Sequence, residues 1–251
     1  MHLQSQKKIL FFLFMLAVVG QVIAQSPMTE EFAVKDTNHL MMDVYMPKTA
    51  APEGGYPCFV YVFGGGFIRG VRNDKAMVPA FEQLAEKGYV VVAIDYRLGL
   101  KGVKKMGISA VNTLENAIRL AVEDLYSATS YLCKNAQRFH INTNQILISG
   151  GSAGAITALQ ADYWLHNQHE ATKLLPADFR YAGVVSFAGA VFSRNGKLKY
   201  ADGNPAPTMM LHGTEDRLVN YGQIEFANIG ELISQPIKTY SSGMVVRLAF
   251  A

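Results

Sequence analysis

The chain has 251 residues, of which 50% are hydrophobic and 17% charged, and such proportions exclude a disordered chain and fit one compact domain. Its formal charge is +3, and without the two lysines of the first 24 residues 21 basic side chains face 20 acidic ones, a charge of +1. A balance so close to neutral gives no electrostatic basis for binding nucleic acid.

The first 24 residues have the features of a secretory signal peptide. A pair of lysines precedes an apolar stretch over residues 9–20, and a small-residue cleavage sequence ends at Ala24. The apolar stretch is short for a membrane span, and no second one follows it. We therefore predict a signal peptide at 1–24, export to the periplasm or the medium, and no integral membrane span after cleavage. An uncleaved membrane anchor is the alternative.

The mature chain, residues 25–251, shows no repeat and no interdomain linker, so we expect a single domain. Strands that alternate with helices imply a mostly parallel sheet covered on both faces. The expected elements, in chain order, are a hairpin over 31–46, strands over 58–63 and 88–97 on either side of a helix over 76–87, a long helix over 112–137, a strand over 146–149, a helix after residue 152, a strand over 181–189, a polar loop over 193–206 and a strand over 207–211.

A candidate nucleophile lies in the sequence Gly150-Gly151-Ser152-Ala153-Gly154, which follows an apolar strand and opens a helix-forming segment. A strand that turns directly into a helix forces the central serine into a strained backbone conformation, where only small neighbours fit. The first N–H groups of the helix then point to the place where an oxyanion would develop. The pattern predicts that Ser152 is a nucleophile.

Two further segments lie at the carboxyl ends of predicted strands, where open α/β sheets build their sites. The strand over 58–63 runs into Gly64-Gly65-Gly66, and a backbone without side chains can approach a substrate closely with free N–H groups. This loop is expected to form the second half of an oxyanion hole. The strand over 207–211 ends in His212-Gly213-Thr214-Glu215-Asp216, which places a carboxylate just past the strand.

Together these segments resemble the α/β-hydrolase family, in particular its esterase and lipase branch, over about residues 30–225. The resemblance implies an α/β-hydrolase fold with Ser152 as nucleophile and Asp216 as the triad acid. It also implies that the N–H groups of Gly65, Gly66 and Ala153 form the oxyanion hole. It requires no metal and no organic cofactor. Phe63 stands where many relatives carry a histidine that shapes the glycine loop without transferring a proton.

The predicted triad has no base, because this branch orders its triad serine, acid, histidine, and no histidine follows His212. The resemblance places the base roughly thirty residues after the acid, where Gly243 leads to Met244. Methionine cannot accept the serine proton, so Met244 would occupy the base position without serving as a base. Residues 226–251 also depart from the family pattern, and we expect an incomplete final strand and helix there, from natural divergence or from a frameshift or truncation of the gene.

The other histidines of the mature chain are not expected to replace the base. The resemblance makes His212 a structural residue, and His140 is expected at the far edge of the sheet. His166 and His169 are expected at the solvated end of the helix after Ser152, about 20 Å from it. They lack the histidine pair at i and i+4 with an intervening glutamate that metalloproteases use, so we predict no metal site.

Three functions remain open at this point. The first is a serine carboxylic-ester hydrolase acting on a small-molecule or polysaccharide-linked ester. The second is a catalytically inactive binding protein that kept the fold, and the third is a serine peptidase-like hydrolase. The two cysteines, Cys58 and Cys133, are expected to be buried thiols, with a disulfide as the alternative in an oxidising compartment.

Overall fold

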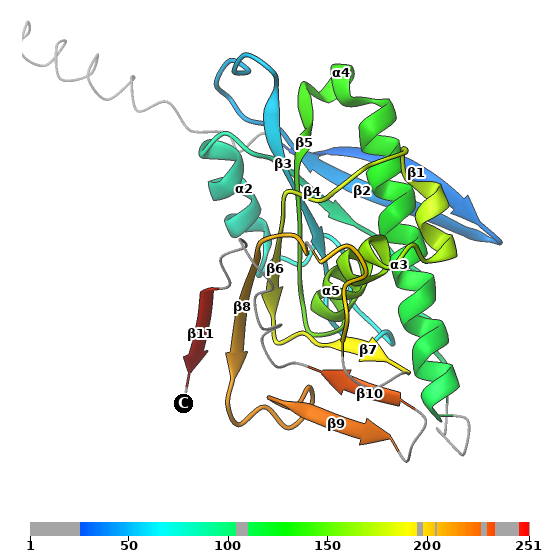
Figure 1. Ribbon diagram of the computed structural model, residues 1–251. Helices are drawn as coiled ribbons and strands as arrows, with labels where there is room; N and C mark the ends of the chain where they lie inside the picture. The colour runs from blue at the N-terminus through cyan, green and yellow to red at the C-terminus, as the bar shows by residue number, and fades with distance from the viewer. Residues whose placement is uncertain are drawn as a thin grey trace, which may run out of the picture.

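The computed structural model describes residues 26–103, 110–194, 198–203, 205–226, 230–233 and 246–250. The predicted signal peptide therefore lies outside the described residues. An eight-stranded sheet in the order β1-β2-β4-β3-β5-β6-β8-β11 forms the centre of the molecule, and a three-stranded sheet in the order β7-β10-β9 lies beside it (Figure 1).

The strands of the large sheet are β1 (Met28–Lys35), β2 (Asn38–Tyr45), β3 (Tyr56–Val62), β4 (Val90–Ile94), β5 (Ile141–Gly151), β6 (Gly183–Phe187), β8 (Thr208–Gly213) and β11 (Val246–Phe250), and those of the small sheet are β7 (Val191–Ser193), β9 (Gln223–Phe226) and β10 (Gly230–Ile233). The helices are α2 (Val78–Glu86), α3 (Ala110–Lys134), α4 (Ala136–Phe139) and α5 (Ala153–His166), with a 3-10 turn η1 (Glu170–Leu174). No helix of the described residues is long and apolar enough to cross a membrane.

The large sheet is mostly parallel, as predicted. β1 pairs antiparallel with β2, and β2 pairs antiparallel with β4, whereas β4, β3, β5, β6, β8 and β11 run parallel to one another. All five residues of β4 are buried, which explains why this strand reads as a continuous apolar run instead of an alternating one. The predicted hairpin is confirmed as β1 and β2, with Asp36 in the turn at a φ of 53°.

Helices cover both faces of the large sheet (Figure 1). α2 lies on one side, and α3 and α5 lie together on the other. The buried side chains of α3 include Ile118, Leu125 and Leu132, which recur at the spacing of one helical face, as the sequence predicted. The segments that follow several of the parallel strands meet at the carboxyl ends of those strands.

The final described strand corrects the expectation of an incomplete last strand. β11 pairs with β8 in parallel register, from Val246 opposite Met209 to Phe250 opposite Gly213. Phe250 therefore reaches the carboxyl edge of the sheet, and Val246 lies towards the other end of the pairing. Met244, the residue predicted at the base position, lies outside the described residues.

Both cysteines are free thiols in the structure, and the expected burial is found for Cys58 but only in part for Cys133. Cys58 is buried within β3, and Cys133 is half-buried near the end of α3. Burial raises the pKa of the Cys133 thiol above its ordinary value. A thiol with a raised pKa is a weaker nucleophile near neutral pH than an ordinary one.

Candidate active site

Ser152 occupies a strained turn between β5 and α5, as the sequence predicted. Its backbone has a φ of 50° and a ψ of −118°, a conformation that side-chain-bearing residues rarely adopt. The N–H group of Ser152 donates to the carbonyl oxygen of Phe187 at the end of β6 (2.8 Å), and its own carbonyl oxygen accepts from Ile156 in α5 (2.9 Å). The turn is thus held by a neighbouring strand on one side and by the first turn of the helix on the other.

The glycines on either side of Ser152 are required by the close approach of β3. A Cβ atom added at Gly154 would lie 2.0 Å from the carbonyl oxygen of Val62. One added at Gly150 would lie 2.4 Å from the carbonyl carbon of Gly154 and 2.6 Å from the Val62 oxygen. A Cβ at Gly151 would meet nothing nearer than the Tyr61 hydroxyl at 3.8 Å. The flanking glycines therefore serve the packing of the turn against β3, whereas Gly151 has room for a side chain.

The glycine loop after β3 lies directly against the nucleophile. A Cβ atom added at Gly64 would lie 3.5 Å from the Cβ of Ser152 and 2.7 Å from the carbonyl oxygen of Gly151. Gly65 and Gly66 follow with φ angles of 117° and 66°, in the region that favours glycine. Ala153, the first residue of α5, is buried beside this loop. The structure thus brings the predicted oxyanion donors to the neighbourhood of Ser152, and their role in catalysis stays a prediction.

An aromatic cluster supports the base of the glycine loop. Phe63 packs on Tyr96 with ring centroids 4.5 Å apart, and the Tyr96 hydroxyl donates to the carbonyl oxygen of Phe63 (3.0 Å). Phe67, at a φ of 59°, meets the same tyrosine edge-on at 6.2 Å. Burial raises the pKa of Tyr96 far above its ordinary value, so the hydroxyl remains a neutral donor. Phe63 therefore anchors the start of the loop by packing on Tyr96.

The predicted acid, Asp216, lies in the turn that follows β8 and is fixed by its own loop. Its Oδ1 atom accepts the N–H groups of Leu218 (2.8 Å) and Val219 (3.0 Å). Its Oδ2 atom lies 3.5 Å from Nε2 of His212. A carboxylate held at one oxygen by two backbone donors keeps its second oxygen in a fixed direction, which is what the orienting acid of a triad needs.

His212 is part of the support of this turn, which matches its predicted structural role. Its Nε2 atom lies 2.7 Å from the carbonyl oxygen of Val219, so this nitrogen carries the proton that is donated. The ring is buried and meets Tyr221 edge-on at 5.7 Å. Within the described residues Nδ1 has no hydrogen-bond partner, and therefore His212 makes no hydrogen bond to the Ser152 hydroxyl through it.

The prediction of two solvated histidines at the end of α5 is wrong. His166 is buried, with Nε2 3.3 Å from Asp162 and Nδ1 2.7 Å from Asp202. Burial alone would lower its pKa, but the hydrogen bonds and charges of the two carboxylates outweigh burial and raise it. His169 stacks on Trp164 with ring centroids 3.8 Å apart, and burial lowers its pKa. The loop containing Asp202 covers the helix end, and nothing local to the helix signals this.

The remaining histidines are engaged elsewhere. His39 pairs with Glu31 across the exposed β1–β2 hairpin (2.6 Å), and His140 adopts a left-handed conformation at the entry to β5, the opposite end of that strand from Ser152. Across the described residues no histidine hydrogen bonds to the Ser152 hydroxyl. No group of three or more histidine, cysteine, aspartate or glutamate side chains arranged to hold a metal ion occurs in the same part of the chain.

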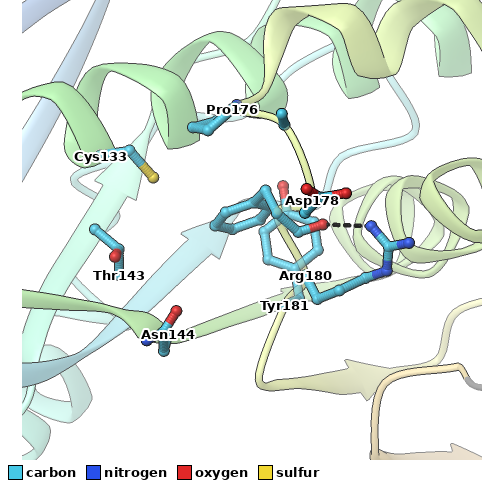
Figure 2. A pocket seen from close by; sticks show the side chains of 9 residues that line it. Cys133, Thr143, Asn144, Pro176, Asp178, Arg180 and Tyr181 are labelled. Atoms are coloured by element: carbon cyan, nitrogen blue, oxygen red, sulfur yellow. Dashed lines mark hydrogen bonds between the residues drawn. The ribbon is translucent and has the colours of Figure 1, made fainter.

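A separate pocket of about 550 Å³ lies at the amino-terminal edge of the sheet (Figure 2). Its lining comes from the end of α3, the start of β5 and the segment that leads into β6, and includes Cys133, Asn144 and Tyr181. The Arg180 guanidinium at its rim donates to the carbonyl oxygen of Phe179 (2.8 Å). Because β5 and β6 both run from this edge towards Ser152, the pocket belongs to the opposite end of the sheet from the nucleophile.

The sheet order, the strained serine after β5, the glycine loop after β3 and the carboxylate after β8 together define an α/β-hydrolase. Residues 42–191 match the BD-FAE family model, which is more than half of the chain. The chain therefore belongs to the BD-FAE family.

Known relatives agree with this placement. The chain is 32% identical over 111 residues to an AB hydrolase superfamily protein of Schizosaccharomyces pombe, covering 44% of this chain and 28% of that protein. It is 30% identical over 119 residues to the fumonisin B1 esterase of Sphingopyxis macrogoltabida, covering 46% and 21%. The chain thus spans between 21% and 28% of the length of these curated relatives.

Solved structures share the fold over more of the chain. Thermogutta terrifontis esterase 2 with bound propionate superposes with a TM-score of 0.64 at 19% identity, covering 91% of this chain and 85% of that one. The same esterase phosphoramylated by tabun gives a TM-score of 0.62 at 20% identity, with 91% and 84% covered. At such identities the likeness establishes the fold.

Proposed function

We propose that this protein is a serine carboxylic-ester hydrolase that transfers the acyl group of its substrate through Ser152. The observation that carries the proposal is the strained serine at the end of β5 with the glycine loop packed against it. Strain of this kind costs about 1–3 kcal/mol, and a fold retains it where the exposed hydroxyl has a use. Membership of the BD-FAE family and the likeness to esterase 2 of Thermogutta terrifontis support the same class of reaction.

In the proposed mechanism the Ser152 hydroxyl attacks the ester carbonyl carbon while a base takes its proton. The oxyanion that forms is stabilised by the N–H groups of Gly65, Gly66 and Ala153, and its collapse expels the alcohol, which regains the proton. Water then attacks the acyl-enzyme and releases the carboxylic acid. The Ser152 N–H group is already bound to Phe187, so the donors must come from these other residues.

The base is the open element of this mechanism. Asp216 offers an oriented carboxylate, but the described histidines are bound elsewhere. We infer that turnover is slow compared with that of enzymes that have a complete triad, since loss of a triad member costs about 10⁴ to 10⁶ in rate while the oxyanion hole continues to act. A binding protein that kept the fold is the competing function.

The substrate proposed here is an ester with an uncharged, apolar acyl group. Three apolar side chains are exposed around the carboxyl edge of the sheet: Ile68 in the glycine loop, Phe187 at the end of β6, and Leu218 beyond the acid. Ile68 extends over Gly66, within 3.9 Å of where a Cβ would stand, and the Phe187 carbonyl oxygen is bound to the nucleophile's N–H. Apolar area left open beside a nucleophile favours an apolar substrate group.

The test of the proposed function combines turnover with active-site labelling. We expect measurable hydrolysis of p-nitrophenyl acetate and butyrate that is absent in Ser152→Ala, and slow labelling of Ser152 by a fluorophosphonate located by peptide mass spectrometry. Rapid labelling would mean that some group serves as an efficient base. A protein that neither hydrolyses these esters nor reacts at Ser152 would instead be a catalytically inactive binding protein that kept the fold.

The predicted base position has its own test. If Met244 stands next to the acid, Met244→His raises ester turnover, and the gain disappears when Ser152→Ala is added. A correctly folded Met244→His variant with unchanged turnover would contradict the predicted base position.

Export is proposed from the leader sequence alone. Expressed in a bacterium with its own first 24 residues, the protein is expected in the periplasm or the medium with a new amino terminus at Gln25. An intact Met1 on a membrane-bound product would contradict the proposed cleavage.

A further inference from the structure

An arginine beyond the glycine loop is bound between two carboxylates of the sheet. The guanidinium group of Arg72 lies with Nε 3.0 Å from Oδ2 of Asp43 and with Nη1 2.8 Å from Oδ2 of Asp95. Asp43 is on β2 and Asp95 directly follows β4, its neighbour in the sheet. The exposed fractions of the Arg72 and Asp43 side chains are 19% and 4%, so the ion pair is largely shielded from water.

Both carboxylates are themselves held in place. Oδ1 of Asp43 accepts from the Thr29 hydroxyl on β1 (2.7 Å). Oδ2 of Asp95 accepts the N–H group of Met41 (3.3 Å), and the Asp95 N–H group donates to the Met41 carbonyl oxygen (2.8 Å). The charge of Arg72 and these hydrogen bonds act against burial, which raises the pKa of Asp95. Arg72 is therefore attached to a rigid part of the sheet rather than to another loop.

The chain between the oxyanion donors and Arg72 is short and folded back on itself. The Gly65 carbonyl oxygen accepts from the N–H groups of Ile68 (3.1 Å) and Arg69 (3.2 Å). Gly70, at a φ of 127°, approaches the start of the loop so closely that an added Cβ would lie 2.6 Å from the Gly64 carbonyl oxygen. A displacement at Arg72 would therefore pass through Gly70 to the peptide groups of the glycine loop.

We propose that Arg72 is a positioning residue for the oxyanion hole, with its ion pairs to Asp43 and Asp95 holding the glycine loop against Ser152. This inference rests on the proposed acyl transfer through Ser152. The loop is anchored at its start by Tyr96 and at its end by Arg72. With both anchors in place, the N–H groups of Gly65 and Gly66 are held in one direction before the substrate arrives, which is the condition under which oxyanion donors are most effective.

Two variants test this role. Arg72→Met keeps an unbranched apolar side chain and removes the charge. Arg72→Lys keeps the charge as a compact ammonium group but lacks the planar fork whose separate nitrogens reach Asp43 and Asp95. A misplacement of about 1 Å in a catalytic group costs up to about 100-fold in rate. We expect Arg72→Met to lower kcat for p-nitrophenyl butyrate about 10- to 100-fold with KM changed less than twofold, and Arg72→Lys to lie between it and the wild type.

Asp162→Asn is the matched control for a general loss of stability. It weakens another shielded ion pair, that of Asp162 with His166, near the far end of α5 and about 15 Å along the helix from Ser152. Assayed below its unfolding transition, Asp162→Asn is expected to be less stable than the wild type with an unchanged kcat. A purely structural role of Arg72 would make its Met variant behave like this control.

Amide hydrogen exchange across residues 64–70 provides a readout that does not depend on turnover. Faster exchange there in Arg72→Met, with β3 and β5 unchanged, is expected if the ion pairs hold the loop. A folded Arg72→Met variant with wild-type kcat, or with wild-type exchange in the loop, would overturn the inference. If the wild type shows neither turnover nor labelling of Ser152, the proposed function fails and the role of Arg72 in catalysis fails with it, whatever the exchange data show.

Discussion

The close packing of the turn between β5 and α5 leads to a prediction about Gly154. Placing a methyl group there, as in Gly154→Ala, sets a Cβ atom 2.0 Å from the Val62 carbonyl oxygen, 2.6 Å from the Val62 carbonyl carbon and 2.7 Å from the Phe63 carbonyl oxygen. All three are backbone atoms, at the end of β3 and the start of the glycine loop. A side chain could rotate away from the new methyl group, but these backbone atoms cannot do so.

The size of the effect follows from how far the backbone must move. Restoring an ordinary contact of about 3.4 Å requires α5 and β3 to separate by more than 1 Å in a close-packed core. Overpacking commonly costs 1–3 kcal/mol, and because neither neighbour is a flexible side chain we expect about 3 kcal/mol or more for Gly154→Ala. Gly151→Ala is the matched control, since its Cβ would meet only the Tyr61 hydroxyl at 3.8 Å.

Urea unfolding followed by circular dichroism measures both variants. With a slope of about 3 kcal/mol per molar urea, a loss of 3 kcal/mol lowers the midpoint by about 1 M, whereas Gly151→Ala is expected to stay within about 0.3 M of the wild type. Labelling of Ser152 should slow in Gly154→Ala, because a displaced α5 moves the Ala153 N–H group. A Gly154→Ala protein with the wild-type midpoint and labelling rate would refute the packing argument.

Three further predictions concern stability, substrate choice and pH. Ser152→Gly should be more stable than Ser152→Ala by up to about 2 kcal/mol in urea unfolding. Glycine relieves backbone strain of about 1–3 kcal/mol, whereas the greater freedom of its unfolded chain costs about 0.4–1 kcal/mol. Equal stabilities would mean that the turn is unstrained. Phe187→Ala should lower kcat/KM for p-nitrophenyl butyrate about tenfold more than for the acetate, because the longer acyl chain loses its apolar contact. An equal loss for both esters would show that the Phe187 ring does not contact the acyl group. The carboxylates of Asp162 and Asp202 raise the pKa of His166 in the folded protein. Their interaction with the protonated ring stabilises the fold fully below the unfolded pKa of about 6.5, and this stabilisation is lost as pH rises through the higher folded pKa. The wild type should therefore exceed His166→Gln in unfolding free energy by more at about pH 6 than at about pH 9, and a difference independent of pH would contradict the ion pairs.

The parts of the fold that the sequence predicts are those that local rules govern. β4 is recognised because its five residues are apolar without interruption, and the β1–β2 hairpin because a polar turn separates two strand-forming segments. The strained turn at Ser152 is recognised because the close packing around it requires glycine at positions 150 and 154, and these glycines can be read from the sequence without knowing the packing. In each case one short segment contains the physical reason for its own conformation.

The parts that it does not predict depend on contacts between distant segments. Arg72 meets carboxylates 29 residues before it and 23 residues after it, and no periodic pattern marks these partners. His166 was expected in solvent because its helix ends there, but Asp202 comes from a loop 36 residues away and covers it. The strand β11 is not predicted, because its position depends on pairing with the open edge of β8. Long-range partners decide all three.

The strain at Ser152 also bears on the choice between an enzyme and a binding protein. The turn is imposed from outside, by the Phe187 carbonyl oxygen on β6 and by the close approach of β3 to Gly150 and Gly154. Replacing the serine by glycine would remove the strain without disturbing either strand, so a protein that only binds would gain stability from that single change. Retention of a side chain at this φ is therefore more readily explained if the hydroxyl is used, which favours slow acyl transfer over simple binding.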